Sequence, residues 1–181
     1  MSRGNTWTNP DGLIVGFSTH SVDDNVGAVT GDSGTLRTYV IELPDATLLE
    51  DTDAITVASI PPQSLAIPRG SIINRATFSV TKVFTSGGAA TLDIGLYALD
   101  ATVDDANGID VDLALTVLDA IGDVVICDGA LVGGVVACGA TSNTDVYVVF
   151  GDEATVYTAG AGVLTLEVLV PHGAQGATLA A

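Results

Sequence analysis

Apolar and polar residues alternate with a period of two along two stretches near the middle of the chain. Thr, Ser, Asp and Gly separate the apolar positions, which are Ala76, Phe78, Val80, Leu92, Ile94 and Leu96. This period is typical of a β-strand with one buried and one solvated face. The stretches flank a Ser-Gly-Gly turn at 86–88, so they predict a β-hairpin. A bulge is expected near Lys82 and Val83, where the alternation slips.

Shorter apolar segments between turn signals predict further strands. These segments are 13–17, 36–43, 54–60, 123–129, 130–139, 144–150, 154–157 and 162–170. Many short strands separated by Gly, Pro and Asp are typical of an all-β protein. We therefore predict a single β-sandwich, jelly-roll-like in its topology.

One segment, 111–122, has a different period and predicts a short helix. Its apolar residues fall four apart, at Leu113, Val117 and Ile121. Gly122 would end the helix, and Asp110 or Asp112 would cap its first turn.

The chain divides into three regions by composition. Residues 1–35 are rich in Gly, Ser, Thr, Asn and Asp and predict an extended N-terminal arm and lead-in. Residues 36–171 hold the predicted sandwich, and residues 172–181 a C-terminal tail. Trp7, the single tryptophan, lies in the arm. It either packs on its own domain or anchors the arm at an interface with a neighbouring subunit.

Charge is the strongest compositional signal. The 181 residues include 22 acidic and 5 basic ones, for a formal net charge of −17. Such a surface repels nucleic acids and anionic membranes over a Debye length of about 8 Å, and five basic residues cannot form a basic stripe. We therefore predict no nucleic-acid and no membrane partner. Solubility, a basic protein partner and divalent cations remain as explanations of the charge.

The two cysteines and the first residues bear on the compartment. Cys127 and Cys138 either face each other across a hairpin or are reduced, buried thiols, and the second reading is the ordinary one in a cytoplasmic chain. The start, MSRGNTWTNPDG, lacks the apolar region of a signal peptide, and no apolar run is long enough for a membrane helix. We expect synthesis in a cytoplasm.

No pattern of catalytic residues is visible. The only histidines, His20 and His172, lie in polar terminal segments, and the GDSG at 31–34 reads as a turn. Zinc prefers four Cys or His ligands, and no such set is spaced for it. We predict no catalytic residue, no cofactor and no enzymatic activity.

The acidic segment 100–112 is the one candidate for a cation site. Its acidic side chains are Asp100, Asp104, Asp105, Asp110 and Asp112. Calcium takes six to eight oxygen ligands from such segments, although the spacing here is not that of an EF-hand. The segment is predicted as a solvated loop with a helix cap, and a structural cation is the alternative.

The stretch IPRGSIINRATFSVTKVFTSGGAATLDIGL at 67–96, followed by AGVLTLEVLV at 161–170, resembles a group of small phage virion proteins. In that group a proline-led strand enters a Ser-Gly-Gly turn, and an acidic insertion and a final strand follow. The resemblance covers under a quarter of the chain. It implies a head or tail structural protein, often a capsid decoration (cement) protein, and it brings no catalytic residues.

The resemblance also implies partners and a location. They are the major capsid protein, other copies of the chain in a homo-oligomer, expected to be a trimer, and the outer capsid surface of a virion assembled in a host cytoplasm. The alternatives are a tail, adaptor or fibre-base virion protein, a carbohydrate-binding β-sandwich module and, least favoured, an enzyme.

Overall fold

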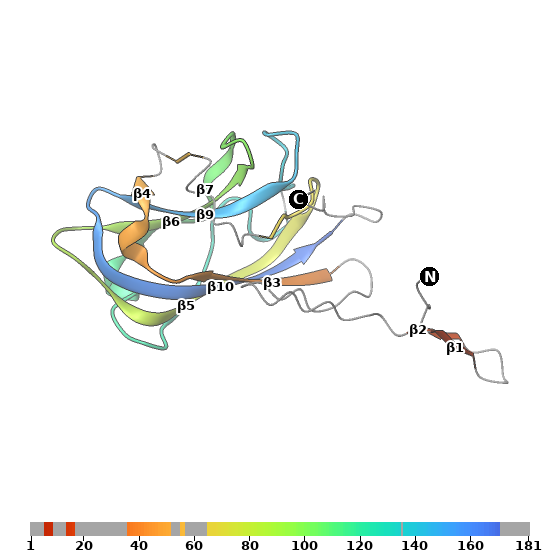
Figure 1. The fold of residues 1–181 in the computed structure, drawn as a ribbon, viewed down its shortest axis with the longest axis horizontal. Coiled ribbons are helices and arrows are strands. Elements are labelled where there is room, and N and C mark those ends of the chain that lie inside the picture. Colours follow the sequence, from red (N-terminus) through yellow and green to blue (C-terminus); the bar gives the residue numbers. More distant parts are fainter. Residues whose placement is uncertain are drawn as a thin grey trace.

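The computed structural model describes residues 6–8, 14–16, 36–51, 55–56, 65–134 and 136–170. Their main feature is a pair of four-stranded sheets stacked face to face, seen as a lower and an upper layer in Figure 1. The strands are β1 (Thr6–Thr8), β2 (Ile14–Gly16), β3 (Leu36–Leu43), β4 (Glu50–Asp51), β5 (Ile72–Ser86), β6 (Thr91–Ala98), β7 (Val103–Ala114), β8 (Val124–Ile126), β9 (Val146–Glu153) and β10 (Tyr157–Leu169). The fold is all-β, and the predicted β-sandwich is confirmed.

We name the two sheets after their central strands. The β5 sheet has the order β3-β10-β5-β8, and the β6 sheet has the order β4-β9-β6-β7. Pairing along the chain is nested, because β3 pairs with β10, β4 with β9, β5 with β8 and β6 with β7. All of these pairs are antiparallel except the short β4–β9 contact, which is parallel. A separate two-stranded sheet joins β1 and β2.

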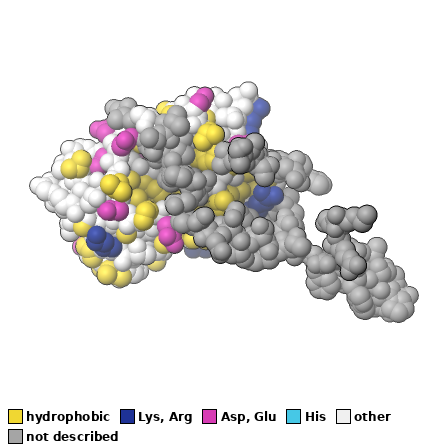
Figure 2. All heavy atoms as spheres, viewed as in Figure 1, with side chains coloured by type: hydrophobic (Ala, Val, Ile, Leu, Met, Phe, Trp, Pro, Cys, Tyr) yellow, Lys and Arg dark blue, Asp and Glu magenta, His cyan; other side chains and the backbone are white. Residues whose placement is uncertain are grey.

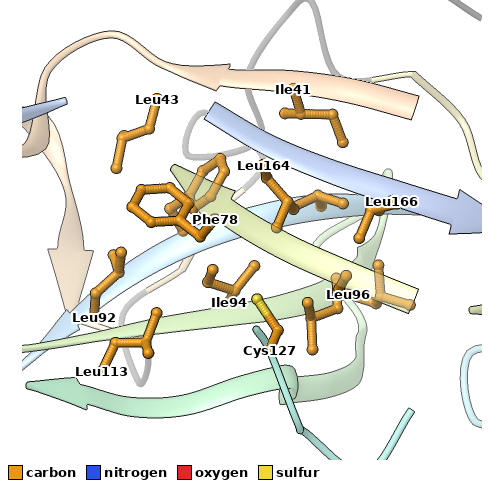
Figure 3. Close-up of a cluster of buried hydrophobic side chains, with 14 of the residues drawn as sticks. Ile41, Leu43, Phe78, Leu92, Ile94, Leu96, Leu113, Cys127, Leu164 and Leu166 are labelled. Carbon is orange, nitrogen blue, oxygen red and sulfur yellow. The ribbon is translucent and has the colours of Figure 1, made fainter. Parts of the chain in front are cut away.

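The core lies between the two sheets. Figure 3 shows side chains of the β5 sheet, among them Phe78 and Leu164, pointing at Leu92 and Ile94 of the β6 sheet. The ring of Phe78 packs 6.0 Å from that of Phe84 and 6.1 Å from that of Phe150, centroid to centroid. Alternating residues of each strand supply this layer, as the period of two predicts.

The predicted hairpin across 76–96 is wrong in its pairing, although both of its strands exist. β5 pairs with β10 and β8, whereas β6 pairs with β9 and β7, so the 87–90 turn crosses from one sheet to the other. Alternation shows that each strand has a buried face. Two strands that stack face to face across the core show the same alternation as two strands that pair edge to edge, so the pattern does not distinguish the two arrangements. The bulge predicted near Lys82 is confirmed by register shifts opposite Ala161.

The predicted helix over 111–122 is also wrong. Residues 103–114 form β7, and only Leu115–Val117 make one 3-10 turn, η4, without a side-chain cap. Leu113 lies opposite Leu92 and enters the core, while Val117 and Ile121 are exposed. Leu113, Val117 and Ile121 therefore do not share a buried face, and the segment up to Ala114 pairs with β6 instead of forming a helix. A second 3-10 turn, η1, spans Ala46–Leu48.

Of the remaining predicted strands, some are confirmed and others are not. Residues 36–43 and 162–170 are confirmed as β3 and part of β10, and 144–150 and 123–129 contain most of β9 and all of β8. Within 130–139 the described residues form turns with one isolated bridge at Val132. The segment 13–17 contains β2. Of the predicted strand 154–157, only Tyr157 is in a strand, as the first residue of β10, and residues 154–156 lie between β9 and β10. The predicted strand at 54–60 lies largely outside the described residues, as do most of the predicted arm and the tail.

Candidate functional site

The five aspartates of the predicted cation loop lie on a strand or its preceding turn, and the prediction of a solvated loop there is wrong. Asp104, Asp105, Asp110 and Asp112 belong to β7, and Asp100 lies in the turn before it. The strand forms because the segment pairs along β6 with several register shifts. The aspartates are therefore spread along β7 and its turn instead of encircling one point.

Asp104 holds a neighbouring loop in place. Its carboxylate accepts hydrogen bonds from the backbone N–H groups of Gly139, Thr141 and Ser142, at 2.8, 2.9 and 3.0 Å. Charge-assisted bonds of this kind are among the stronger hydrogen bonds in proteins. Asp104 therefore positions the 139–142 loop against β7.

The other acids of the segment also have local partners. Asp100 accepts the N–H of Thr102 at 3.0 Å, which holds the pKa of this exposed carboxyl below its usual range. Asp105 accepts the N–H of Asn107 at 3.4 Å, and Asp112 accepts the hydroxyl of Thr91 at 3.2 Å. The described residues contain no group of three or more His, Cys, Asp or Glu side chains arranged to hold a metal ion.

Among the described residues three carboxyl groups are buried, and only Asp110 was among the site residues named from the sequence. Asp93 and Asp152, on the adjacent strands β6 and β9, and Asp110 on β7 are all nearly inaccessible to solvent. Burial raises the pKa of each carboxyl, and nearby acids raise it further. Asp93 accepts the N–H of Asp112 at 2.7 Å, whereas one oxygen each of Asp110 and Asp152 lacks a hydrogen-bond partner.

Asp152 faces Tyr157 at the end of the core where β9 turns into β10. The Tyr157 backbone N–H donates to the Asp152 carboxyl, while the buried Tyr157 hydroxyl has no partner. Burial, together with the negative charges of Asp152 and Asp93, raises the pKa of the Tyr157 hydroxyl. Unpartnered buried polar atoms of this kind are destabilising.

Both cysteines are free and buried, as one of the two sequence interpretations predicts. Burial is the main cause that raises the pKa of the Cys127 thiol, and the neighbouring Asp110 carboxyl raises it further. Burial also raises the pKa of Cys138 to about 12. A nucleophilic cysteine needs a lowered pKa and access to solvent, so these thiols are suited to packing.

Charge is divided unevenly between the sheets. The strands of the β6 sheet carry nine acidic residues and no basic one: Glu50, Asp51, Asp93, Asp104, Asp105, Asp110, Asp112, Asp152 and Glu153. The strands of the β5 sheet carry three basic and two acidic residues: Arg37, Arg75, Lys82, Glu42 and Glu167. The excess of negative charge therefore does not extend evenly over the sandwich.

The outward side of the β5 sheet mixes Val, Ile, Thr and Ser with three charged residues. We call it the β5 outer face. Strand register places on it the rows Val40–Thr165–Thr77–Ile126, Glu42–Val163–Ser79–Val124 and Thr38–Glu167–Arg75. Figure 2 has the view of Figure 1, with the sheets one above the other, and on that side of the molecule hydrophobic, acidic and basic side chains are interspersed. Val124 and Ile126 are exposed, and Ile126 is 67% accessible.

The outward side of the β6 sheet is covered instead. Tyr97, Tyr147 and Val149 form a second buried cluster there, with Ile55 and Ala66 packed against it. Among the described residues the two buried clusters are this one and the core between the sheets. Within the described ranges neither cluster lies on the β5 outer face, and we take this face as the candidate interaction surface.

Trp7 and the two histidines belong to the terminal regions of the chain. The backbone of Trp7 belongs to β1, opposite Val15 of β2, and its predicted interface role stays a prediction. Both histidines lie outside the described residues. Within the part of the chain that is described, no helix is long and apolar enough to cross a membrane.

Comparison with known proteins gives one similarity. No family model and no curated protein matches this sequence. Among solved structures, the chain is similar to a chain from the capsid of Ralstonia phage GP4, with a TM-score of 0.40 and 18% identity. The match covers 86% of this chain and 93% of that chain. A likeness this loose assigns neither family nor function.

Proposed function

We propose that the protein is a non-enzymatic structural component of a phage virion, a decoration (cement) protein that binds the major capsid protein on the outside of the head and stabilises the shell. The observation that carries the proposal is the resemblance of 67–96 and 161–170 to small phage virion proteins. These segments are far apart in sequence, yet β10 pairs with β5 along its length, and β6 packs across the core from both. The resemblance thus concerns one structural unit, the centre of the sandwich.

A jelly roll is the topology we propose for the eight strands of the sandwich. A long antiparallel hairpin wrapped into two sheets pairs the first strand with the last, the second with the seventh, the third with the sixth and the fourth with the fifth. The observed pairs β3·β10, β4·β9, β5·β8 and β6·β7 follow this nesting. Jelly rolls are common among viral capsid domains. The parallel β4–β9 contact is the departure from the pattern.

A decoration protein needs a stable domain and a contact surface, and no active site. The core between the two sheets supplies the first, and the β5 outer face offers the second. Assembly as a homo-oligomer, with three copies around a threefold position, would give each shell many copies. A weakly basic shell exterior would favour the approach of subunits with a charge of −17.

The carbohydrate-binding alternative has less support. Platforms that bind sugars present exposed aromatic rings, whereas every aromatic side chain that the structure describes is buried: Tyr39, Phe78, Phe84, Tyr97, Tyr147, Phe150 and Tyr157.

Immunogold electron microscopy on particles of the source phage tests the proposed location. Gold distributed over the whole head surface is the expected result. Gold confined to the tail or to one vertex would replace decoration by a tail, adaptor or fibre-base role. Particles without gold, in lysates where the protein is abundant, would overturn the virion proposal.

A further inference from the structure

Two buried polar side chains without full hydrogen bonding flank the turn between β9 and β10. Asp152 lies opposite Leu92 in the sheet register, so its side chain is on the core side, where it is 4% accessible to solvent. Tyr157 is 3% accessible and donates its backbone N–H to the Asp152 carboxyl. One Asp152 oxygen and the Tyr157 hydroxyl have no hydrogen-bond partner. A carboxylate placed there has little to replace its lost hydration, so the neutral acid fits the site better than the anion.

The charges around Asp152 also oppose its ionisation. No strand of the β6 sheet carries a basic residue. On β5, which pairs with β10, Lys82 lies opposite Ala161, four residues further along β10 than Tyr157. The described titratable groups around Asp152 are Asp51 on β4, Asp93 on β6, Glu153 on β9 itself and Tyr157 on β10. Three of these four are carboxyl groups, so an anion at Asp152 would meet like charge.

The turn is a segment that can open separately from the sheets. Ala154, Thr155 and Val156 belong to neither strand, and the Val156 side chain is exposed. Ala154 has a φ of 65°, in the left-handed region that residues other than glycine seldom adopt. The Thr155 N–H donates to the Glu153 carbonyl at 2.7 Å, and the Ser86 hydroxyl donates to the Val156 carbonyl at 3.0 Å. Opening the turn breaks these bonds and relieves the strain without breaking a strand pair.

We propose that the β9–β10 turn is a pH-sensitive gate, closed while Asp152 is protonated and opening as Asp152 ionises. Burial raises the pKa of Asp152 above its unfolded value of about 3.9. The closed turn is therefore favoured at low pH and destabilised as pH rises through the folded pKa. Opening brings the carboxylate into water and uncovers the Tyr157 ring, which packs 5.3 Å from the Phe84 ring at this end of the core. The gate requires no virion, so it stands or fails separately from the proposed function.

Amide hydrogen exchange of the full chain between pH 5 and pH 8, corrected for intrinsic exchange rates, tests the gate. The N–H groups of Thr155 and Tyr157 report on the turn, and that of Phe78 at the centre of β5 reports on the core. Protection of the turn should fall at least tenfold more than protection of the core over this range. Equal losses in both would indicate global unfolding and overturn the gate, as would a turn whose protection does not depend on pH.

A matched pair of substitutions assigns the effect to one carboxyl. Asp152→Asn keeps an acceptor for the Tyr157 N–H and cannot ionise, so its turn should stay protected at pH 8. Asp110→Asn alters another buried carboxyl with an unpartnered oxygen, on the other side of β6, and should keep the wild-type pH dependence of the turn. The opposite result in either folded variant would overturn the proposal. Circular dichroism establishes folding, and the wild-type and Asp110→Asn profiles decide the matter if Asp152→Asn does not fold.

Discussion

The two sheets of the sandwich share one core but differ on their outward sides. The β6 sheet carries all nine of its strand charges as carboxylates, three of them buried, and its outer side is closed by Tyr97, Tyr147 and Val149. The β5 sheet is nearly balanced in charge, and its outer side presents Val, Ile, Thr and Ser together with Arg75, Glu42 and Glu167. The outward apolar residues of the β6 sheet are buried, which suits that side to face solvent. On the β5 sheet Val124 and Ile126 are exposed, which suits that side to contact a partner.

The largest expected effect comes from the core that the sheets share. Phe78 is inaccessible to solvent and packs on the rings of Phe84 and Phe150. Phe78→Ala should lower the free energy of unfolding by about 3–5 kcal/mol, because it removes a ring and leaves a cavity. Urea denaturation measures the change. An unaltered midpoint with an unaltered slope would mean that the sheets do not meet through this residue.

A matched valine pair distinguishes the two outward sides. Val149→Ala, in the covered cluster of the β6 sheet, should destabilise by about 2 kcal/mol, since two methyl groups leave a packed site. Val163→Ala, half-buried on the β5 outer face, should cost less than about 1 kcal/mol in the monomer. Equal losses in chemical denaturation at low protein concentration would remove the distinction.

The buried carboxyls predict an unusual dependence of stability on pH. The pKa values of Asp93, Asp110 and Asp152 are raised in the folded chain, so each group contributes most stability below its unfolded pKa, about 3.9. That contribution is lost as pH rises through the folded pKa. The protein should therefore melt at a higher temperature at pH 5 than at pH 8, in calorimetry at constant ionic strength.

Asp152→Asn isolates one of these groups. The amide keeps an acceptor oxygen for the Tyr157 N–H and cannot ionise, so stability at pH 7 should rise by on the order of 1 kcal/mol. The melting temperature should also change less between pH 5 and pH 8. Glu153→Gln, on the next and exposed residue, is the control. A variant that is less stable at pH 7 with an unchanged pH profile would contradict the account.

The smallest effect is expected from calcium. Asp104 binds the 139–142 loop, and Asp100, Asp105 and Asp112 have local partners, so these carboxylates are not free to converge on an ion. Calcium should raise the melting temperature no more than a sodium salt of equal ionic strength, through screening alone. A rise specific to calcium would support the structural cation that was the alternative interpretation of residues 100–112.

Local patterns predicted strands better than they predicted how strands pair. Period-two alternation correctly gave inward residues of β5 and β6, such as Phe78 and Leu92, because that signal depends on near neighbours in the chain. It could not say whether β5 meets β6 at an edge or across the core, because strand partners such as β10 lie about 80 residues away. The nested order is a property of the whole chain.

For the acidic segment 100–112 and the residues after it, local patterns predicted the wrong secondary structure. Carboxylates every few residues favour a solvated loop, and apolar residues four apart favour a helix, yet the segment pairs with β6 as β7. Long-range pairing outweighed both local preferences, and it buried Asp110 beside Cys127 at the cost of a raised pKa. The β5 outer face was not predicted from the sequence, because its rows join residues of four strands that lie far apart along the chain.

Adding the purified protein back to phage heads that lack it tests shell stabilisation most directly. Heads are heated with and without wild-type protein, and release of the packaged DNA is followed by dye fluorescence, while co-sedimentation reports binding. Binding in many copies per head, with release shifted to a higher temperature, is the predicted result. Heads that bind no protein and release their DNA at an unchanged temperature would contradict a role as a decoration protein.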